Sequence, residues 1–160
     1  MNKVERIARL TPYEQDIARW SDEQASLIRA GRFDAVDREN IAEEIESLGR
    51  SDRREIRSRI GVILLHLLKW EFQPEKRKVG WRFTLREQRH QLEIIFEESP
   101  SLVAFARDVF ERDYELAQTK AMDETGLPST GVPQNCPYPF SNILDSDFFP
   151  GAAWTGAGEA

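Results

Sequence analysis

The sequence predicts an all-α fold, a bundle of four to five helices followed by an extended C-terminal strap rich in proline and aromatic residues. Two observations support this prediction. Apolar residues recur at intervals of three and four positions along most of the chain, and no segment alternates with the period of two that a half-buried strand shows. Near the C-terminus the pattern changes, because LPSTGVPQNCPYPF holds four prolines in fourteen residues and cannot form a long regular element.

The first helix is expected to start at Thr11 and to run to Ala30. Threonine can cap a helix, Pro12 suits the first helical position, and Glu14 can complete a capping box. Gly31 can then end the helix in a left-handed conformation.

Two further helices are expected over residues 34–48 and 51–72. Gly49 either ends the earlier one or weakens it without breaking it, since the sequence after it regains helical spacing. Gln73 and Pro74 stop the later one, because a residue that precedes proline is disfavoured in helical geometry.

The basic stretch PEKRKVG is expected to be a solvated turn. A fourth helix is predicted over residues 80–98, and a fifth starts at Ser99-Pro100 and ends near residue 125, with Gly126 as its C-terminal cap.

The C-terminal segment is too apolar for a disordered tail, because it contains Tyr138, Phe140, Phe148 and Phe149. It is therefore expected to lie as a strap over the bundle, with one short helical turn near residues 141–144. Residues 11–150 are predicted to form a single helical domain, and residues 1–10 and 151–160 to be flexible termini.

Composition is typical of globular proteins, with 40% hydrophobic and 31% charged residues. The net charge of -6 argues against a nucleic-acid-binding surface. One cysteine, Cys136, excludes an internal disulfide and a cysteine-rich zinc site. The longest apolar run, GVILLHLL, is too short for a membrane span, and the N-terminus lacks the apolar core of a secretory signal. We therefore expect a cytoplasmic protein with no membrane partner, no bound metal and no cofactor.

The stretch NIAEEIESLG combines helical spacing with a run of carboxylates. On a helical wheel its residues fall into three sets: an apolar stripe, a polar border to that stripe, and the opposite, solvent-facing side. These sets are, in order, Ile41, Ile45 and Leu48; Asp37, Asn40 and Glu44; and Glu39, Glu43 and Glu46. The stripe is expected to be buried, and the border to be partly buried.

Polar residues also interrupt or border the apolar stripes of the other helices. A buried polar group without a partner costs about 1–3 kcal/mol, so these residues are expected to meet one another or to line a wet cleft. The candidate catalytic residues are Glu44, His66, Asp16 and Arg59, and the candidate binding residues are Gln24, Asn40 and Gln88. One hypothesis gathers Asp16, Gln24, Glu44, His66 and Gln88 in a single polar pocket; the alternative is a structural polar layer that fixes helix register.

An ordered set of motifs resembles a bacterial family, domain-of-unknown-function family 29. The motifs are YEQDIARW, SDEQASLIRAGRFD, NIAEEIESLGRSDRREIRSRI, LLHLLKWEFQPEKR, WRFTLREQR, ETGLP and CPYPFSNILDSDFFP, and together they cover residues 13–150. The resemblance implies a bacterial protein that folds as a helical bundle, and it assigns no catalytic residue.

Two classes of function stay open at this point. The first is an interaction or regulatory module with a polar pocket between helices, which binds an unknown protein partner, a small ligand or a second copy of itself. The second is an enzyme, either a helical ribonuclease-like protein that uses Arg59 and His66, or a hydrolase with a single metal ion at His66 and Glu44. The spacing R-x6-H is close to the R-x4-6-H signature of helical toxin nucleases, in which a histidine transfers the proton and an arginine stabilises phosphate charge.

Overall fold

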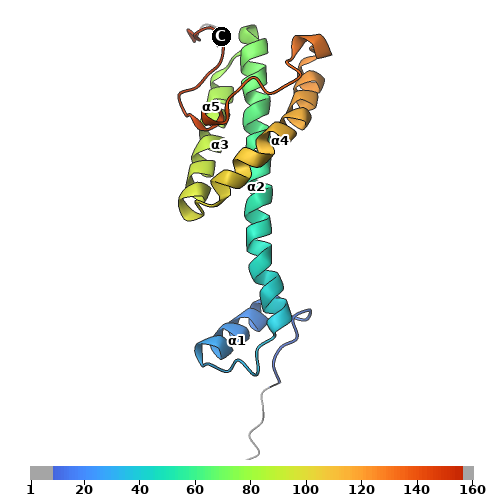
Figure 1. Cartoon of the computed structure of the whole chain (residues 1–160), viewed down its shortest axis with the longest axis vertical. Coiled ribbons are helices and arrows are strands. Elements are labelled where there is room, and N and C mark those ends of the chain that lie inside the picture. Colours follow the sequence, from blue (N-terminus) through green and yellow to red (C-terminus); the bar gives the residue numbers. More distant parts are fainter. Residues whose placement is uncertain (1–8, 157–160) are drawn as a thin grey trace, which may run out of the picture. The chain divides into compact units, whose positions relative to one another are not determined.

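The computed structural model describes residues 9–156, and within that range it contains helices and loops but no strand (Figure 1). The predicted all-α class is therefore confirmed. The α-helices are α1 (Ile17–Arg29), α2 (Arg38–Phe72), α3 (Val79–Glu98), α4 (Leu102–Thr125) and α5 (Phe140–Leu144), with short 3-10 turns at Pro74–Lys76 and Ser129–Gly131.

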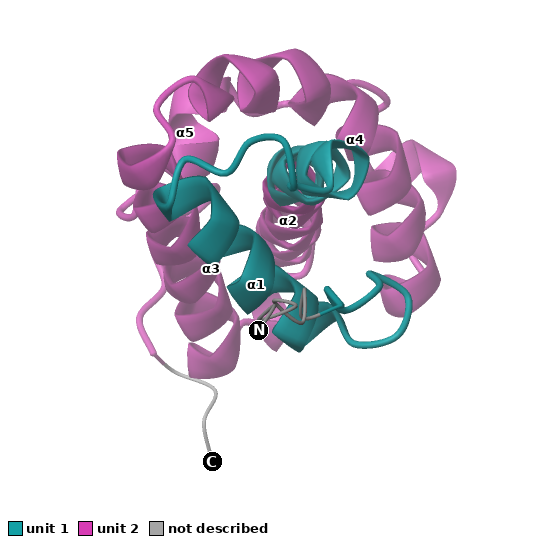
Figure 2. Cartoon of the chain, turned by 90° about the horizontal axis from the view of Figure 1, so that it is seen from below, with its two compact units in different colours: residues 1–50 teal, residues 51–160 magenta. Residues whose placement is uncertain are grey.

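The chain divides into two compact units, residues 1–50 and residues 51–160, which Figure 2 colours separately. A single domain over residues 11–150 stays a prediction. Of the termini that were expected to be flexible, residues 1–8 and 157–160 lie outside the described part. No helix among the described residues is long and apolar enough to cross a membrane.

Helix α1 begins later than the sequence predicted. Thr11 does not cap it; instead Pro12 accepts backbone bonds from Gln15 and Asp16 in a tight turn. The cap is Asp16, whose carboxylate accepts a hydrogen bond from the backbone N–H of Arg19 at 3.0 Å. Its C-terminal end agrees with the prediction, because Gly31 adopts a left-handed φ of 71° just beyond the helix.

Helix α2 is one continuous helix of 35 residues, so of the two alternatives left open at Gly49 the structure shows the unbroken helix. A glycine inside a helix costs about 1 kcal/mol relative to alanine, and at Gly49 this cost does not interrupt the helix. The helix also starts four residues after Asp34, at a point where Asp37 accepts a bond from the backbone N–H of Asn40 at 3.3 Å. It ends at Phe72, before Gln73-Pro74, as predicted.

The second unit has a continuous apolar core. Helices α2, α3 and α4 contribute fully buried aliphatic side chains, and the strap contributes Tyr138 and Ile143. The most deeply buried large residues are Trp70, Ile56, Ile60, Ile63, Leu64, Leu67, Leu68, Leu85, Leu92 and Ile143. Burial of each such side chain contributes about 1.5–3 kcal/mol, so this core supplies most of the unit's apolar stabilisation.

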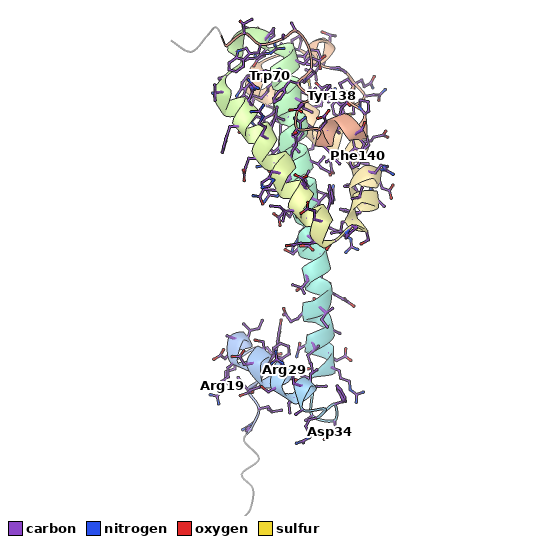
Figure 3. The ribbon with its side chains drawn as sticks, turned by 90° about the vertical axis from the view of Figure 1, so that its left-hand side faces the viewer. Arg19, Arg29, Asp34, Trp70, Tyr138 and Phe140 are labelled. Atoms are coloured by element: carbon purple, nitrogen blue, oxygen red, sulfur yellow. The ribbon has the colours of Figure 1, made fainter. Side chains whose placement is uncertain are left out.

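The strap packs on the helices of the second unit, as the sequence predicted (Figure 3). Phe140 stacks against Phe110 of α4 with ring centroids 5.3 Å apart, and Tyr138 donates a hydrogen bond to Glu71 at 2.6 Å. The short helix α5 lies where one helical turn was expected. The contacts continue to Trp154, whose ring meets Trp70 edge to face at 5.6 Å.

Candidate functional site

The polar border of α2 forms a hydrogen-bonded cluster around Asp37. The indole Nε1 of Trp20 and the amide of Asn40 both donate to Oδ2 of Asp37, at 3.2 and 2.7 Å. The backbone N–H of Asp37 in turn donates to the side-chain oxygen of Gln24 at 2.8 Å. The bond from Asn40 is the main reason why the pKa of Asp37 lies below its ordinary value. The cluster joins α1 to the start of α2 and keeps Asp37 ionised.

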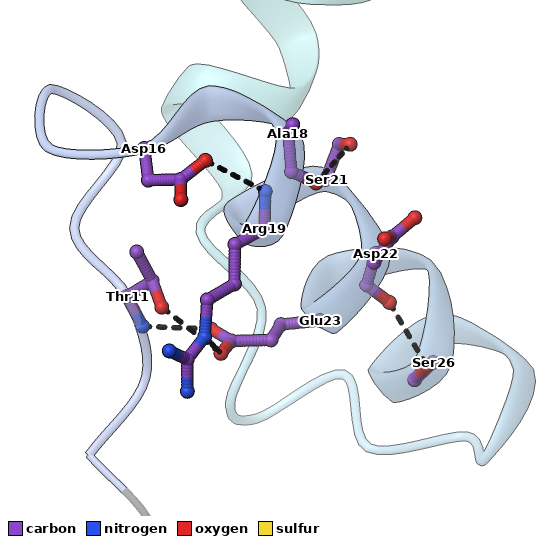
Figure 4. A network of polar contacts seen from close by, with 8 residues as sticks. All are labelled: Thr11, Asp16, Ala18, Arg19, Ser21, Asp22, Glu23 and Ser26. Atoms are coloured by element: carbon purple, nitrogen blue, oxygen red, sulfur yellow. Dashed lines mark hydrogen bonds and ion pairs between the residues drawn. The ribbon is translucent and has the colours of Figure 1, made fainter.

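Two other candidates of the first unit also hold local structure. Glu44 accepts a hydrogen bond from the hydroxyl of Tyr13, and this bond is the main cause of the raised pKa of Tyr13. Asp16 caps α1, beside a second network in which Glu23 accepts bonds from the backbone and side chain of Thr11 (Figure 4). Both candidates are therefore engaged within the first unit.

The candidates of the second unit lie on α2 and α3. Arg59 donates to Gln88 at 3.0 Å and to Glu55 of its own helix at 2.6 Å. Ring nitrogen Nδ1 of His66 lies 2.9 Å from the backbone oxygen of Val62. Burial lowers the pKa of His66, which favours the neutral imidazole.

The structure thus brings some candidates together in pairs. Gln24 and Asn40 meet at Asp37, and Arg59 meets Gln88. The predicted common pocket would draw Asp16, Gln24 and Glu44 from the first unit and His66 and Gln88 from the second, and it stays a prediction. Every buried side-chain nitrogen or oxygen of the described residues has a hydrogen-bond partner within the protein. None of these buried atoms therefore needs a ligand to complete its hydrogen bonding.

Two buried arginines were missed by the sequence reasoning. Arg89 of α3 is 3% exposed and donates to three strap carbonyls, those of Ile143, Asn142 and Phe148, at 2.8, 3.2 and 3.0 Å. Burial lowers its pKa to about 10, so it stays charged at neutral pH. Its spacing was the available signal, because residue 89 lies four positions after Leu85 and three before Leu92 on the apolar face.

The second buried arginine corrects the prediction that the basic loop is a solvated turn. Arg77 donates to the backbone oxygens of Trp70, Pro150 and Ala152. Its guanidinium also lies over the Trp70 ring, 4.9 Å from the centroid. Arg77 and Arg89 therefore fix the strap through backbone carbonyls, a type of contact that depends little on the strap's own side chains.

The apolar stripe of α2 is not buried as predicted. Ile45 and Leu48 are 64% and 67% exposed, and Ile41 is half-buried. The physical reason is that α1 meets the polar border of α2, through Trp20 and Gln24, and leaves the stripe beside it uncovered. The first unit also exposes Leu10, Ile17, Ile28 and Phe33.

A groove runs along α2 and α4 in the second unit, with a volume of about 290 Å³. Its floor is apolar and its rim carries basic side chains. The lining residues are Arg54, Arg57, Ser58, Gly61, Val62, Leu65, Asp113, Leu116, Ala117 and Lys120.

Residues 12–149 match the family model described as "Domain of unknown function DUF29", which covers most of the chain. The chain belongs to the DUF29 family. The resemblance noted in the sequence is thereby confirmed. Neither the comparison with curated proteins nor the comparison with solved structures found a match.

The chemistry of this DUF29 chain can be read from its described side chains. No group of three histidine, cysteine, aspartate or glutamate side chains is placed to hold a metal ion in residues 9–156. Cys136 is half-buried and burial raises the pKa of its thiol, so it is not activated as a nucleophile. The features that stand out among the described residues are the uncovered α2 stripe and the α2–α4 groove.

Proposed function

We propose that this chain is a protein–protein interaction module of the bacterial cytoplasm, and that it binds a helical partner through the α2 stripe, Ile41, Ile45 and Leu48. The observation that carries the proposal is the exposure of Ile45 and Leu48 on a well-formed helix. Anchors at positions i, i+4 and i+7 are the pattern by which an amphipathic helix docks on a partner. In the first unit, where only Trp20 and Gln24 are buried among the described residues, such large apolar side chains are available for a partner.

The polar candidates support this proposal by having structural roles. Asp37, Gln24 and Asn40 hold α1 against α2 through hydrogen bonds, which leaves the stripe free for binding. The ribonuclease alternative is less well supported, because Arg59 is held by Glu55 and Gln88 whereas His66 faces the carbonyl of its own helix. A regulatory role of the polar pocket remains a prediction on which the proposal does not depend.

A pair of photo-crosslinking variants tests the proposal. A photoreactive phenylalanine analogue replaces Leu48 in one variant and Glu39 in the other, in the full chain, expressed in bacterial cells. The two positions are nine residues apart on α2, which puts them on opposite sides of the helix at 100° per residue. Both are exposed, so neither substitution disturbs the core.

We expect discrete crosslinked species from position 48 and none of comparable yield from position 39. The species are identified by mass spectrometry, with the crosslink mapped on both partners. A specific partner, whether another protein or a second copy of this chain, supports the proposal. Equal yields at the two positions, or no adduct at position 48, would overturn it.

A further inference from the structure

The α2–α4 groove is lined only by residues of the second unit. We propose that it binds a small amphipathic carboxylate, whose alkyl body of about eight carbons lies on the apolar floor and whose carboxylate meets Arg54 and Arg57. The inference goes beyond the proposed function and does not depend on it, because the α2 stripe, residues 41–48, belongs to the first unit.

Two ion pairs join the helices that form the groove. Arg57 of α2 binds Asp113 of α4 at 2.6 Å, and Lys69 of α2 binds Glu124 of α4 at 2.7 Å. The apolar lining residues, within 61–65 of α2 and 116–117 of α4, lie between these two pairs along both helices. The helices are thus joined on both sides of the floor, so the site is formed before a ligand binds, as small-molecule sites usually are.

The floor has room for an apolar ligand body. Val62, Leu65 and Ala117 line it. A Cβ built on Gly61 would meet nothing within 4 Å, and Leu116 on the α4 side is 60% exposed. The groove volume of about 290 Å³ equals the liquid volume of about ten water molecules, at about 30 Å³ each. It therefore suits a ligand of about ten non-hydrogen atoms, the size of octanoate.

One part of the rim offers donors for an anionic head group. Arg57 uses Nε and Nη2 for its bonds to Asp113, and its Nη1 makes no hydrogen bond to another described residue. The Asp113 side chain is only 10% exposed, so this bidentate pair holds the guanidinium in a fixed orientation. Arg54 and Ser58, four positions apart on one side of α2, also line the groove. Within residues 9–156 neither of their side chains has a hydrogen bond or ion pair, so both can bind a carboxylate.

The charge of the groove favours an anion. Three cations and one carboxylate line it, which gives a net charge of +2. Arg54 and Lys120 are exposed, so a carboxylate beside them stays in contact with water and avoids the cost of burying a charge. The alkyl stem of Lys120 can at the same time cover part of the ligand's apolar body.

The size of the floor favours a small ligand over a docked protein segment. Its apolar part spans about two turns of α2 and less than one turn of α4. A stable protein interface buries about 1,000 Å² or more, which requires a larger apolar surface than these few side chains provide.

A nuclear magnetic resonance titration of the ¹⁵N-labelled full chain tests the inference. The probes are octanoate and octanol, the uncharged alcohol of the same chain length. Octanoate should shift the backbone amide signals of residues 54–65 and 113–120 in a saturable way, with a dissociation constant of about 1 mM or below. Octanol should bind about three- to five-fold more weakly, because it lacks the charge that Arg54 and Arg57 recognise.

Gly61→Leu tests the place of the alkyl body. The new side chain enters open space and replaces a glycine inside a helix, so the melting temperature should stay at or above that of the wild type. The leucine would occupy the floor, and the dissociation constant of octanoate should rise at least about ten-fold. Gly80→Leu is the matched control, because Gly80 is a helical glycine with open space around it that does not line the groove. It should leave the octanoate affinity unchanged.

Arg54→Gln tests the place of the carboxylate. It should weaken octanoate about three- to five-fold and leave octanol unaffected, since only octanoate has a charge to lose contact with. Arg112→Gln is the matched control: it makes the same charge change at an exposed position of α4 that does not line the groove. Its octanoate affinity should stay within about two-fold of the wild type, because salt screens charges at such a distance.

Three results would overturn the inference. The first is the absence of saturable shifts in residues 54–65 and 113–120. The second is a folded Gly61→Leu variant that binds octanoate as tightly as the wild type does. The third is equal affinity for octanoate and octanol. If Gly61→Leu does not fold, the ratio of octanoate to octanol affinity in Arg54→Gln decides: a ratio unchanged from the wild type contradicts the inference.

Discussion

Replacing Arg89 by methionine should release the strap from the second unit. Methionine keeps the apolar stem but removes the donors to three carbonyls of the strap. Hydrogen bonds to a charged group contribute about 1.5–3 kcal/mol each, and the guanidinium's desolvation offsets a large part of their sum. Because the three carbonyls lose a buried donor, we expect a net loss of about 3 kcal/mol in the free energy of unfolding.

This loss has a size that thermal denaturation resolves. For a unit of roughly 110 residues, 1 kcal/mol corresponds to about 4 °C, so the melting temperature should fall by about 10 °C or more. The rate of backbone amide hydrogen exchange in residues 137–150 should rise at the same time. Arg86→Met is the matched control, because Arg86 is an exposed arginine on the same helix and contacts Phe149 only at 5.9 Å. A melting temperature within about 2 °C of wild type, with the strap still protected, would refute the reasoning.

Two further predictions concern single side chains of the second unit. Burial lowers the pKa of His66 below about 6.5, so the unfolded chain takes up a proton that the folded chain resists, and the free energy of unfolding should fall as the pH drops below about 6.5. Urea unfolding at several pH values measures this loss. The control His90→Gln removes an exposed histidine and should still lose stability at low pH, whereas His66→Gln should not. The same pH dependence of the free energy of unfolding in both variants would contradict the prediction. Gly151→Ala should destabilise the strap by about 1–2 kcal/mol, because Gly151 has a φ of 83° and its Cβ would lie 2.9 Å from the Arg77 guanidinium. Gly156→Ala has a similar positive φ of 77° but open space around it, so it should destabilise the strap less than Gly151→Ala does.

Features set by local physics could be predicted from the sequence. Gly31 and Gly126 end their helices in left-handed conformations, as expected, since glycine alone adopts them without steric cost. The end of α2 at Phe72 was also predicted correctly, because proline disfavours helical backbone geometry in the residue that precedes it. Asp37 and Glu44 are half-buried, whereas Glu39 is exposed, as the wheel indicated.

Features that depend on which segment of the chain packs against a given surface could not be predicted. The wheel identified Ile45 and Leu48 as one apolar face, but periodicity does not say what covers a face, and here α1 covers the neighbouring polar border. The same limit applies to Arg89. Its place on the apolar side of α3 was readable, yet its role depends on carbonyls more than fifty residues away in the chain.

The two units are stabilised in different ways, and this difference connects the fold with the proposed binding. The second unit buries a continuous set of aliphatic side chains, whereas the first buries Trp20 and Gln24 and relies on the hydrogen bonds around Asp37. A net hydrogen bond contributes about 0.5–1.5 kcal/mol, and covering one large apolar side chain about 1.5–3 kcal/mol. Covering Ile45 and Leu48 with a partner would therefore stabilise the first unit by as much as its own polar contacts do. Because a partner that binds only the folded state shifts the folding equilibrium towards that state, occupancy of the stripe and the integrity of the α1–α2 contact should rise together.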